Sequence, residues 1–220
     1  MFKGHCFPKA IILQAVYFKL RFSLSYRDIE ELLRIRGVVV DHATIQRWVI
    51  KFTPMIDMNF RKRKKNPGMR WKLDETYIKV KGKWCYLYRA VDKQGKTIDF
   101  LLTHRRNKRA AQLFLIKAIK QNGTPEIINI DKSGANKQGI RTYNKRNSTR
   151  IQWRQCKYLN NIVEQDHRFI KWRTKNMLGF KSFESAQITL SGIETVRMIK
   201  KDQLINPRIT PFNSFCSLAV

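Results

Sequence analysis

The sequence has few cysteines and no long apolar run. Its four cysteines are widely separated and form no Cys-x-x-Cys pair, which argues against a zinc site or a disulfide framework. We therefore expect free thiols in a reducing cytoplasm. No segment approaches the about 18 apolar residues of a transmembrane helix. The apolar segment 10–18 is followed by cations rather than by a small-residue cleavage site, so we do not interpret it as a signal peptide.

Acidic residues are also scarce. The chain has 16 Asp and Glu against 45 Lys and Arg, giving a net charge of +29. The positive charges repel one another unless a polyanion binds to the surface, and nucleic acid is the leading candidate partner. An anionic membrane surface is the alternative, but no lipidation motif or long basic amphipathic helix favours it. At 43% hydrophobic residues, the chain can bury a core, so global disorder is not expected.

The N-terminal third predicts short helices joined by a glycine-containing turn. Ser25 and Asp41 are N-cap residue types, and Gly37 lies in the turn between the helices that they begin. This pattern matches a helix-turn-helix. The alternative is a small helical packing module with a basic surface. In the helix-turn-helix interpretation, the outward side chains of the second helix reach base edges and phosphates; they are His42, Thr44, Gln46, Arg47 and Lys51.

A change of composition marks the end of this region. Residues 61–65 are five consecutive cations, and Asn-Pro-Gly follows at 66–68. We assign residues 1–57 to the helix-turn-helix domain and 58–69 to a basic linker, which either tracks phosphates or is a solvated tether.

The next segments alternate in the order of an α/β fold. Strands are predicted at 71–80, 84–91 and 97–103, then a helix at 110–120 and a short apolar strand at 127–131. Three antiparallel strands, a helix and a further strand are the opening of a ribonuclease-H-like fold. The predicted fold class is therefore an α/β ribonuclease-H-like core, with a mixed five-stranded sheet flanked by helices, preceded by an all-α domain.

Three carboxylates form a candidate metal site in this fold. Asp74 lies midway along the first strand and Asp131 at the end of the fourth, so they would approach each other across adjacent strands. Glu164, on a later helix, is placed to be the third. Three carboxylates can hold two Mg²⁺ ions about 3.5–4 Å apart for an in-line displacement at phosphorus. Mn²⁺ suits such an all-oxygen site as well.

The helix that carries Glu164 has two interpretations. Arg168 and Lys171 share its face at i+4 and i+7, which suits a site that handles phosphates. The alternative is a solvated surface helix with a Glu–Arg pair. Asp166 would be turned roughly 200° away from Glu164.

Other carboxylates compete for the same roles. Glu75 directly follows Asp74 on a strand and is expected to face the opposite side. Asp92 lies in a predicted hairpin turn, where Asp is common. Asp99 lies in the third strand and is expected to pair with a nearby cation.

Three sequence blocks resemble a known family. Trp-x-x-Asp-Glu-Thr-Tyr at 71–77, Ile-Asp-Lys-x-Gly-Ala-Asn at 130–136 and the twelve residues 157–168 resemble the catalytic blocks of bacterial DDE transposases. The likeness is to the IS-six group of insertion sequences, and it runs from about Phe7 to Lys201. Residues 25–28 and 41–48 are similar to that group's helix-turn-helix.

The resemblance implies particular roles for residues. Asp74, Asp131 and Glu164 would be the catalytic and metal-binding triad. Lys171 would contact DNA beside the cut, with His167 and Arg168 in the same neighbourhood. It also implies a catalytic domain over 70–201; the tail at 202–220 has no family pattern and is expected to be irregular.

The resemblance implies a transposase as the function. Such an enzyme binds the terminal inverted repeats of an insertion sequence, cleaves a strand with two metal ions and uses the exposed 3′-hydroxyl to attack target DNA. Its partners would be double-stranded DNA and further copies of itself, in a homodimer or larger synaptic assembly at the bacterial nucleoid, with no membrane. The alternatives are a catalytically decayed transposase that acts as a DNA-binding repressor, and a ribonuclease-H-type nuclease, against which the N-terminal helices argue.

Overall fold

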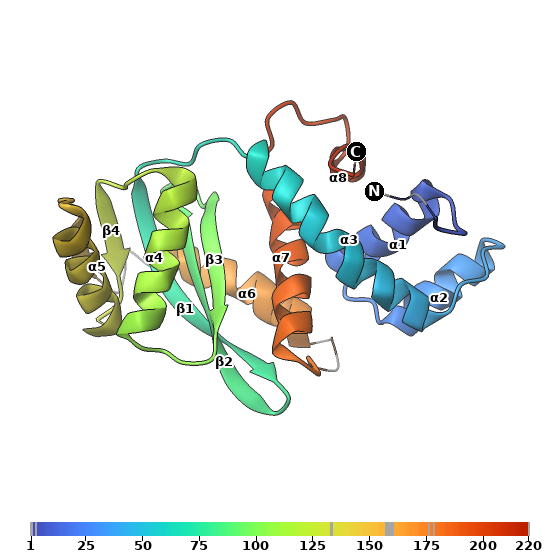
Figure 1. The fold of residues 1–220 in the computed structure, drawn as a ribbon, viewed down its shortest axis with the longest axis horizontal. Coiled ribbons are helices and arrows are strands. Elements are labelled where there is room, and N and C mark those ends of the chain that lie inside the picture. The colour runs from blue at the N-terminus through green and yellow to red at the C-terminus, as the bar shows by residue number, and fades with distance from the viewer. Residues whose placement is uncertain are drawn as a thin grey trace. The chain divides into compact units, whose positions relative to one another are not determined.

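The fold consists of two compact units, one of which is built from two separate stretches of the sequence (Figure 1). A computed structural model describes residues 2, 4–132, 134–156, 161–175, 177 and 179–219. The first unit combines Met1–Lys65 with Arg173–Val220, and the second is Asn66–Trp172. Within the described ranges, no helix is long and apolar enough to cross a membrane.

The first unit is helical. It contains α1 (Lys9–Arg21), α2 (Tyr26–Ile35), α3 (His42–Lys62), α7 (Phe183–Lys200) and α8 (Pro211–Cys216). Ser25 begins α2 with a reciprocal capping box, in which its hydroxyl accepts from the Asp28 N–H and the Asp28 carboxylate accepts from the Ser25 N–H. Asp41 begins α3 by accepting from the N–H groups of Ala43 and Thr44. Both predicted N-caps are therefore confirmed.

The extent of this unit differs from the predicted domain boundaries. Residues 58–62 of the predicted linker belong to α3. The buried stripe of this helix continues through Phe52, Ile56 and Phe60. This i, i+4, i+8 stripe needs an apolar partner beyond residue 57, and α7 supplies it. The compact helical unit also includes the chain from Arg173 onward, part of which lies within the predicted catalytic range 70–201. The tail is also partly ordered, since α8 buries Phe215.

Gly192 permits the close packing of α7 on the N-terminal helices. A Cβ atom there would lie 2.5 Å from Cδ2 of Leu20 and 2.7 Å from Cγ2 of Thr53. Only a residue without a side chain allows this approach, so α7 is an integral part of the helical unit.

The second unit is a mixed sheet with flanking helices. Its strands are β1 (Arg70–Val80), β2 (Lys83–Asp92), β3 (Thr97–Thr103), β4 (Ile127–Ile130) and β5 (Gln152–Gln155), in the order β3-β2-β1-β4-β5. The β1–β2 and β2–β3 pairs are antiparallel, whereas β4 is parallel to β1 and β5. The helices are α4 (Lys108–Asn122), α5 (Gly134–Asn147) and α6 (Asn161–Lys175). The ribonuclease-H-like arrangement of a mixed five-stranded sheet is confirmed.

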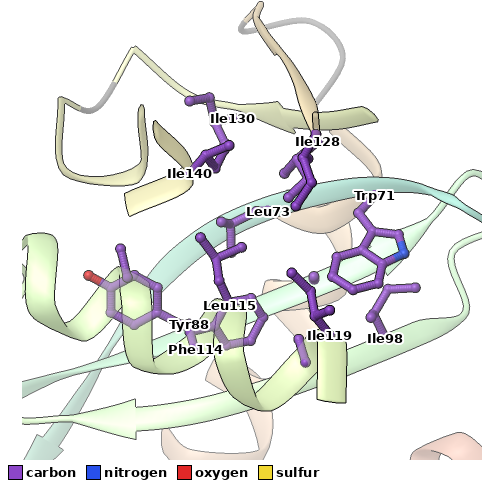
Figure 2. Close-up of a cluster of buried hydrophobic side chains, with 14 of the residues drawn as sticks. Trp71, Leu73, Tyr88, Ile98, Phe114, Leu115, Ile119, Ile128, Ile130 and Ile140 are labelled. Carbon is purple, nitrogen blue, oxygen red and sulfur yellow. The ribbon is translucent and has the colours of Figure 1, made fainter. Parts of the chain in front are cut away.

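One face of this sheet forms the main apolar core. Figure 2 shows Trp71 and Leu73 of β1 meeting Phe114 and Leu115 of α4. The core also includes Tyr88, Ile98, Ile119, Ile128, Ile130 and Ile140. Because Trp71 and Leu73 of β1 point into this core, their neighbours Lys72 and Asp74 face the other side of the sheet. The core thereby fixes the face of the sheet toward which the Cβ atoms of Asp74 and Glu75 point.

Candidate active site

The pairing of β1 with β4 places two aspartates at the same level. The register joins Arg70 to Ile127 and Lys72 to Asn129, an offset of 57 residues (127 − 70). Asp74 and Asp131 have the same separation (131 − 74). The ladder ends at Lys72 and Asn129, two residues before Asp131, and β4 itself ends at Ile130. The edge of β1 beyond Lys72 is therefore open toward Asp131, and side chains from β1 can gather there.

Three carboxylates meet at this open edge. One oxygen each from Asp74, Glu75 and Asp131 lies within 4.8 Å of the other two. The Glu75 side chain is 3% exposed, Asp74 17% and Asp131 36%, so the cluster opens to solvent on the Asp131 side. Carboxylate oxygens at this spacing are the ligands that hard divalent cations prefer. The donor set thus fits a Mg²⁺ or Mn²⁺ ion.

The position of Glu75 corrects one expectation. We expected Glu75 to face away from Asp74, because neighbours on a strand alternate. The alternation is present, but it describes the Cβ direction and not the end of a long side chain. Residues 74 and 75 are both half-buried, between buried Leu73 and buried Thr76. At the open edge, the longer Glu75 side chain reaches the cluster from the other face.

Arg106 joins two of these carboxylates. Its Nη2 lies 2.9 Å from Oδ2 of Asp131 and 3.1 Å from Oε2 of Glu75. Arg106 follows β3 and is one-third exposed. It offsets part of the negative charge that the cluster concentrates. The sequence does not single out Arg106, because a cation just after a strand has no distinguishing pattern in so basic a chain.

The cluster strongly perturbs Asp74. Burial is the main cause that raises the pKa of its carboxyl to about 7, and the charges of Glu75, Asp131 and Glu164 add to the rise. Burial also raises the pKa of Glu75, which the Arg106 charge opposes. Carboxyls held close together in a partly buried site disfavour their own ionisation unless a cation is present. The site is therefore electrostatically suited to bind one.

Helix α6 is anchored beside this cluster by a buried ion pair. Arg89, the cross-strand partner of Asp74, is fully buried and donates to the Asp166 carboxylate. Asp166 is therefore a structural anchor and lies outside the carboxylate cluster. Asp92 and Asp99 also have local roles: Asp92 accepts from backbone N–H groups at 68, 94 and 96, and Asp99 pairs with Lys117 at 3.0 Å.

Glu164 lies in the first turn of α6 and is exposed. Its charge contributes to the raised pKa of Asp74, although its carboxylate is not among the three that lie within 4.8 Å of one another. Arg168 and Lys171 are exposed on the same helix, as the i+4 and i+7 spacing predicts. The first four residues of the third sequence block, 157–160, lie outside the described residues.

His167, which we grouped with the DNA contacts beside the cut, lies next to the carboxylate cluster. Its side chain is only 6% exposed, and its Nδ1 lies 3.6 Å from Oδ2 of Asp74. It follows the anchor Asp166 directly on α6, and Arg168, the next residue, is exposed.

The candidate contacts on α3 are mostly exposed but have local partners. His42, Gln46, Arg47 and Lys51 are exposed, and Thr44 is half-buried. The Thr44 hydroxyl donates to Oδ2 of Asp41 at 2.6 Å and accepts from Arg47 at 3.4 Å. Nδ1 of His42 lies 2.9 Å from a Glu30 carboxylate oxygen, and Nζ of Lys51 lies 2.9 Å from Nε2 of His5.

Comparisons with known proteins agree on one family. A family model described as "DDE domain" matches residues 68–203. The chain is 41% identical over 201 residues to the transposase for insertion sequence-like element IS431mec of Staphylococcus aureus, covering 91% of this chain and 88% of that protein. The same identity and coverage hold for the transposase of insertion sequence element IS257 in transposon Tn4003, also from Staphylococcus aureus.

A weaker likeness exists to a solved structure. The catalytic core domain of BIV integrase is 18% identical and has a TM-score of 0.46, covering 68% of this chain and 95% of that one. The family match and the near-full-length identity to the two transposases settle the relationship. The chain belongs to the IS240/IS26 family of insertion-sequence DDE transposases.

Proposed function

We propose that this transposase binds the terminal inverted repeats of its element, cleaves a DNA strand and joins the exposed 3′-hydroxyl to target DNA. The observation that carries the proposal is the placement of Asp74 and Asp131 at one level of two paired strands, with carboxylate oxygens within 4.8 Å. Glu164, whose charge acts on Asp74, completes the proposed catalytic triad.

The triad residues would hold Mg²⁺ or Mn²⁺, two ions in the full site. Bound there, the ions would activate the attacking water or hydroxyl and stabilise the leaving oxygen. Asp74, Asp131 and Glu164 supply the oxygen ligands, and Glu75 is a further candidate ligand because it shares the cluster. Arg106 offsets negative charge through its ion pairs with Glu75 and Asp131. His167 positions Asp74 by packing against its carboxylate.

The chain's cations would hold the DNA. Arg168 and Lys171 lie on the exposed face of the helix that carries Glu164, where they can contact phosphates on the scissile strand. Gln46, Arg47 and Lys51 on α3 would contact the inverted repeat. Because two element ends must be joined, we expect at least a homodimer when both are bound.

Strand transfer on an oligonucleotide that ends in the element's inverted repeat tests this function. With Mg²⁺, wild-type protein should form joined products, whereas Asp131→Asn and Glu164→Gln should lose about 10³-fold or more of the rate, the scale seen when a group that stabilises transition-state charge is removed. Glu126→Gln is the matched control, because Glu126 is an exposed carboxylate (63%) that pairs only loosely with Arg70 at 3.8 Å.

The outcomes separate the alternatives. If both triad variants join DNA at the wild-type rate, the triad assignment is wrong. If the wild-type protein binds the repeat in a salt-sensitive way but never cleaves it, the decayed DNA-binding protein is the better description. If it instead degrades an RNA–DNA hybrid and leaves repeat DNA intact, it is a ribonuclease-H-type nuclease.

A further inference from the structure

The β1–β2 hairpin carries exposed aromatic rings that the catalytic site does not use. Tyr77 is 49% exposed and Trp84 is 59% exposed. Their ring centroids lie 6.1 Å apart, and Tyr77 also contacts Tyr86 at 5.3 Å. Tyr86 packs on the apolar core. The three rings therefore form a supported row that begins at the core and ends in solvent.

The hairpin is well ordered by its pairing and its turn. Residues Val80 and Lys83 pair across a two-residue turn in which Lys81 and Gly82 have φ of 47° and 75°, as a tight hairpin turn requires. Figure 1 shows the hairpin extending past the neighbouring strands. Its last residues pair only with each other, because β3 reaches no further than Tyr86 and β4 no further than Lys72.

The surroundings of the rings are cationic. The hairpin has no acidic residue from Thr76 to Val91, and Lys79, Lys81 and Lys83 are all exposed. Lys79 Nζ lies 5.8 Å from the centre of the Trp84 ring. A lysine at positive φ is disfavoured relative to glycine or asparagine, so the turn geometry does not explain why position 81 is a lysine. Attraction of a polyanion to this positive charge does explain it.

The middle ring of the row, Tyr77, lies near the carboxylate cluster along β1. Tyr77 is two residues from Glu75 on the same face of β1, a step of about 7 Å along a strand. A strand whose phosphate lies at the cluster would therefore bring its neighbouring bases over Tyr77 and Trp84.

We propose that Tyr77, Trp84 and Lys79 form a stacking platform for unpaired DNA bases beside the reacting phosphate. The proposal rests on the DNA-processing function proposed above. Exposed aromatic rings among cations bind single-stranded nucleic acid by stacking, while the cations neutralise phosphates. In a duplex the bases are already stacked, so the platform should favour a DNA end whose strands are separated. A second copy of the chain is the competing occupant.

The test compares two DNA probes of one sequence without divalent metal, so that no cleavage intervenes. One probe is a fully paired duplex, and the other is a fork whose unpaired arm contains 2-aminopurine. Wild-type protein should bind the fork at least about fivefold more tightly, the lower end for stacking of one base, and should quench the 2-aminopurine. A Tyr77→Ala/Trp84→Ala double variant should lose the preference and the quenching, but bind the paired duplex within about twofold.

Two further variants make the test specific. Leu113→Ala removes another exposed apolar side chain of the same unit (53% exposed) and should keep the fork preference. Lys79→Ala should weaken fork binding and lower its dependence on salt by about one released counterion. Circular dichroism and thermal unfolding should show all variants folded, since the replaced side chains are exposed.

Three results overturn the proposal. These are equal wild-type binding of fork and duplex, a fork preference that survives in the folded double variant, and a double variant that changes only self-association in sedimentation. The last result would identify the row as a contact between protein copies. Strand transfer by wild type and its loss in Asp131→Asn are measured separately with Mg²⁺, so a failure of the platform is distinguishable from a failure of the proposed function.

Discussion

Replacing Asp74 by asparagine should stabilise the protein while abolishing its activity. In the absence of metal, burial and three neighbouring carboxylates raise the pKa of Asp74 from 3.8 to about 7. The unfolded chain has the lower value, so ionisation of Asp74 opposes folding. The native state keeps more protons than the unfolded state between these two values, and stability therefore falls as pH rises from about 4 to about 7 and is level above that.

The magnitude follows from the same difference. At about 1.36 kcal/mol per pH unit, the raised pKa of Asp74 lowers the free energy of unfolding of the metal-free protein by about 4 kcal/mol at pH 8 and by about 1.6 kcal/mol at pH 5, relative to low pH where the carboxyl is protonated in both states. Asparagine has the shape of the neutral acid and no charge. We therefore expect Asp74→Asn to raise the free energy of unfolding by about 2–4 kcal/mol at pH 8, allowing for relaxation of the site, and by clearly less at pH 5.

Urea unfolding at the two pH values, with metal removed, measures this effect. Glu126→Gln is the control, and its exposed carboxylate should change the free energy of unfolding by no more than about 0.5 kcal/mol. Added Mg²⁺ should stabilise the wild type at pH 8, because a bound ligand adds its binding free energy, and should stabilise Asp74→Asn less. If Asp74→Asn is neutral or destabilising at pH 8, or equally stabilising at both pH values, the electrostatic account of the cluster is refuted.

Three other substitutions test a candidate metal ligand, a buried ion pair and a helix cap. Glu75→Gln should weaken Mg²⁺ binding measured by calorimetry if Glu75 is a ligand, and unchanged affinity would restrict Glu75 to its ion pair with Arg106. Arg89→Met removes the guanidinium that donates to buried Asp166, and it should lower the free energy of unfolding in urea by about 3–5 kcal/mol. The double variant Arg89→Met/Asp166→Leu should recover most of that loss. A single variant as stable as wild type would contradict the role of this ion pair in anchoring α6. Ser25→Ala should cost about 1 kcal/mol by removing the α2 cap, with Ser25→Thr as the mild control, and an unchanged melting temperature would argue against the cap's importance.

Much of the architecture was predictable because local patterns agree with it. The N-caps Ser25 and Asp41 are side chains within three residues of the N–H groups that they accept from, so the sequence contains the whole interaction. Strands β1 to β4 follow from short apolar runs between turn residues, whereas the polar strand β5 has no such run. The nearness of Asp74 and Asp131 was also expected, since Asp74 lies on β1 and Asp131 directly follows β4, its neighbour in the sheet.

The helical unit could not be delimited from local patterns. The apolar stripe of α3 and that of α7 are each visible in the sequence, but nothing local says that they pack on each other. That pairing depends on the shape match at Gly192, where α7 meets Leu20 and Thr53. The compact units of the structure therefore do not follow the predicted boundaries at residues 57 and 201, although the DDE family model does span residues 68–203.

The sequence by itself determined the family, the order of the elements from α1 to β4, and two of the carboxylates that meet at one end of the β1–β4 ladder. The tertiary structure decided which other side chains join them. Glu75 and Arg106 are 31 residues apart (106 − 75) yet form an ion pair, and His167 meets Asp74 from a distant helix. The position of a residue on a strand or helix sets the direction of its Cα–Cβ bond. The open strand edge and the packing of α6 determine where the charged group of the side chain lies.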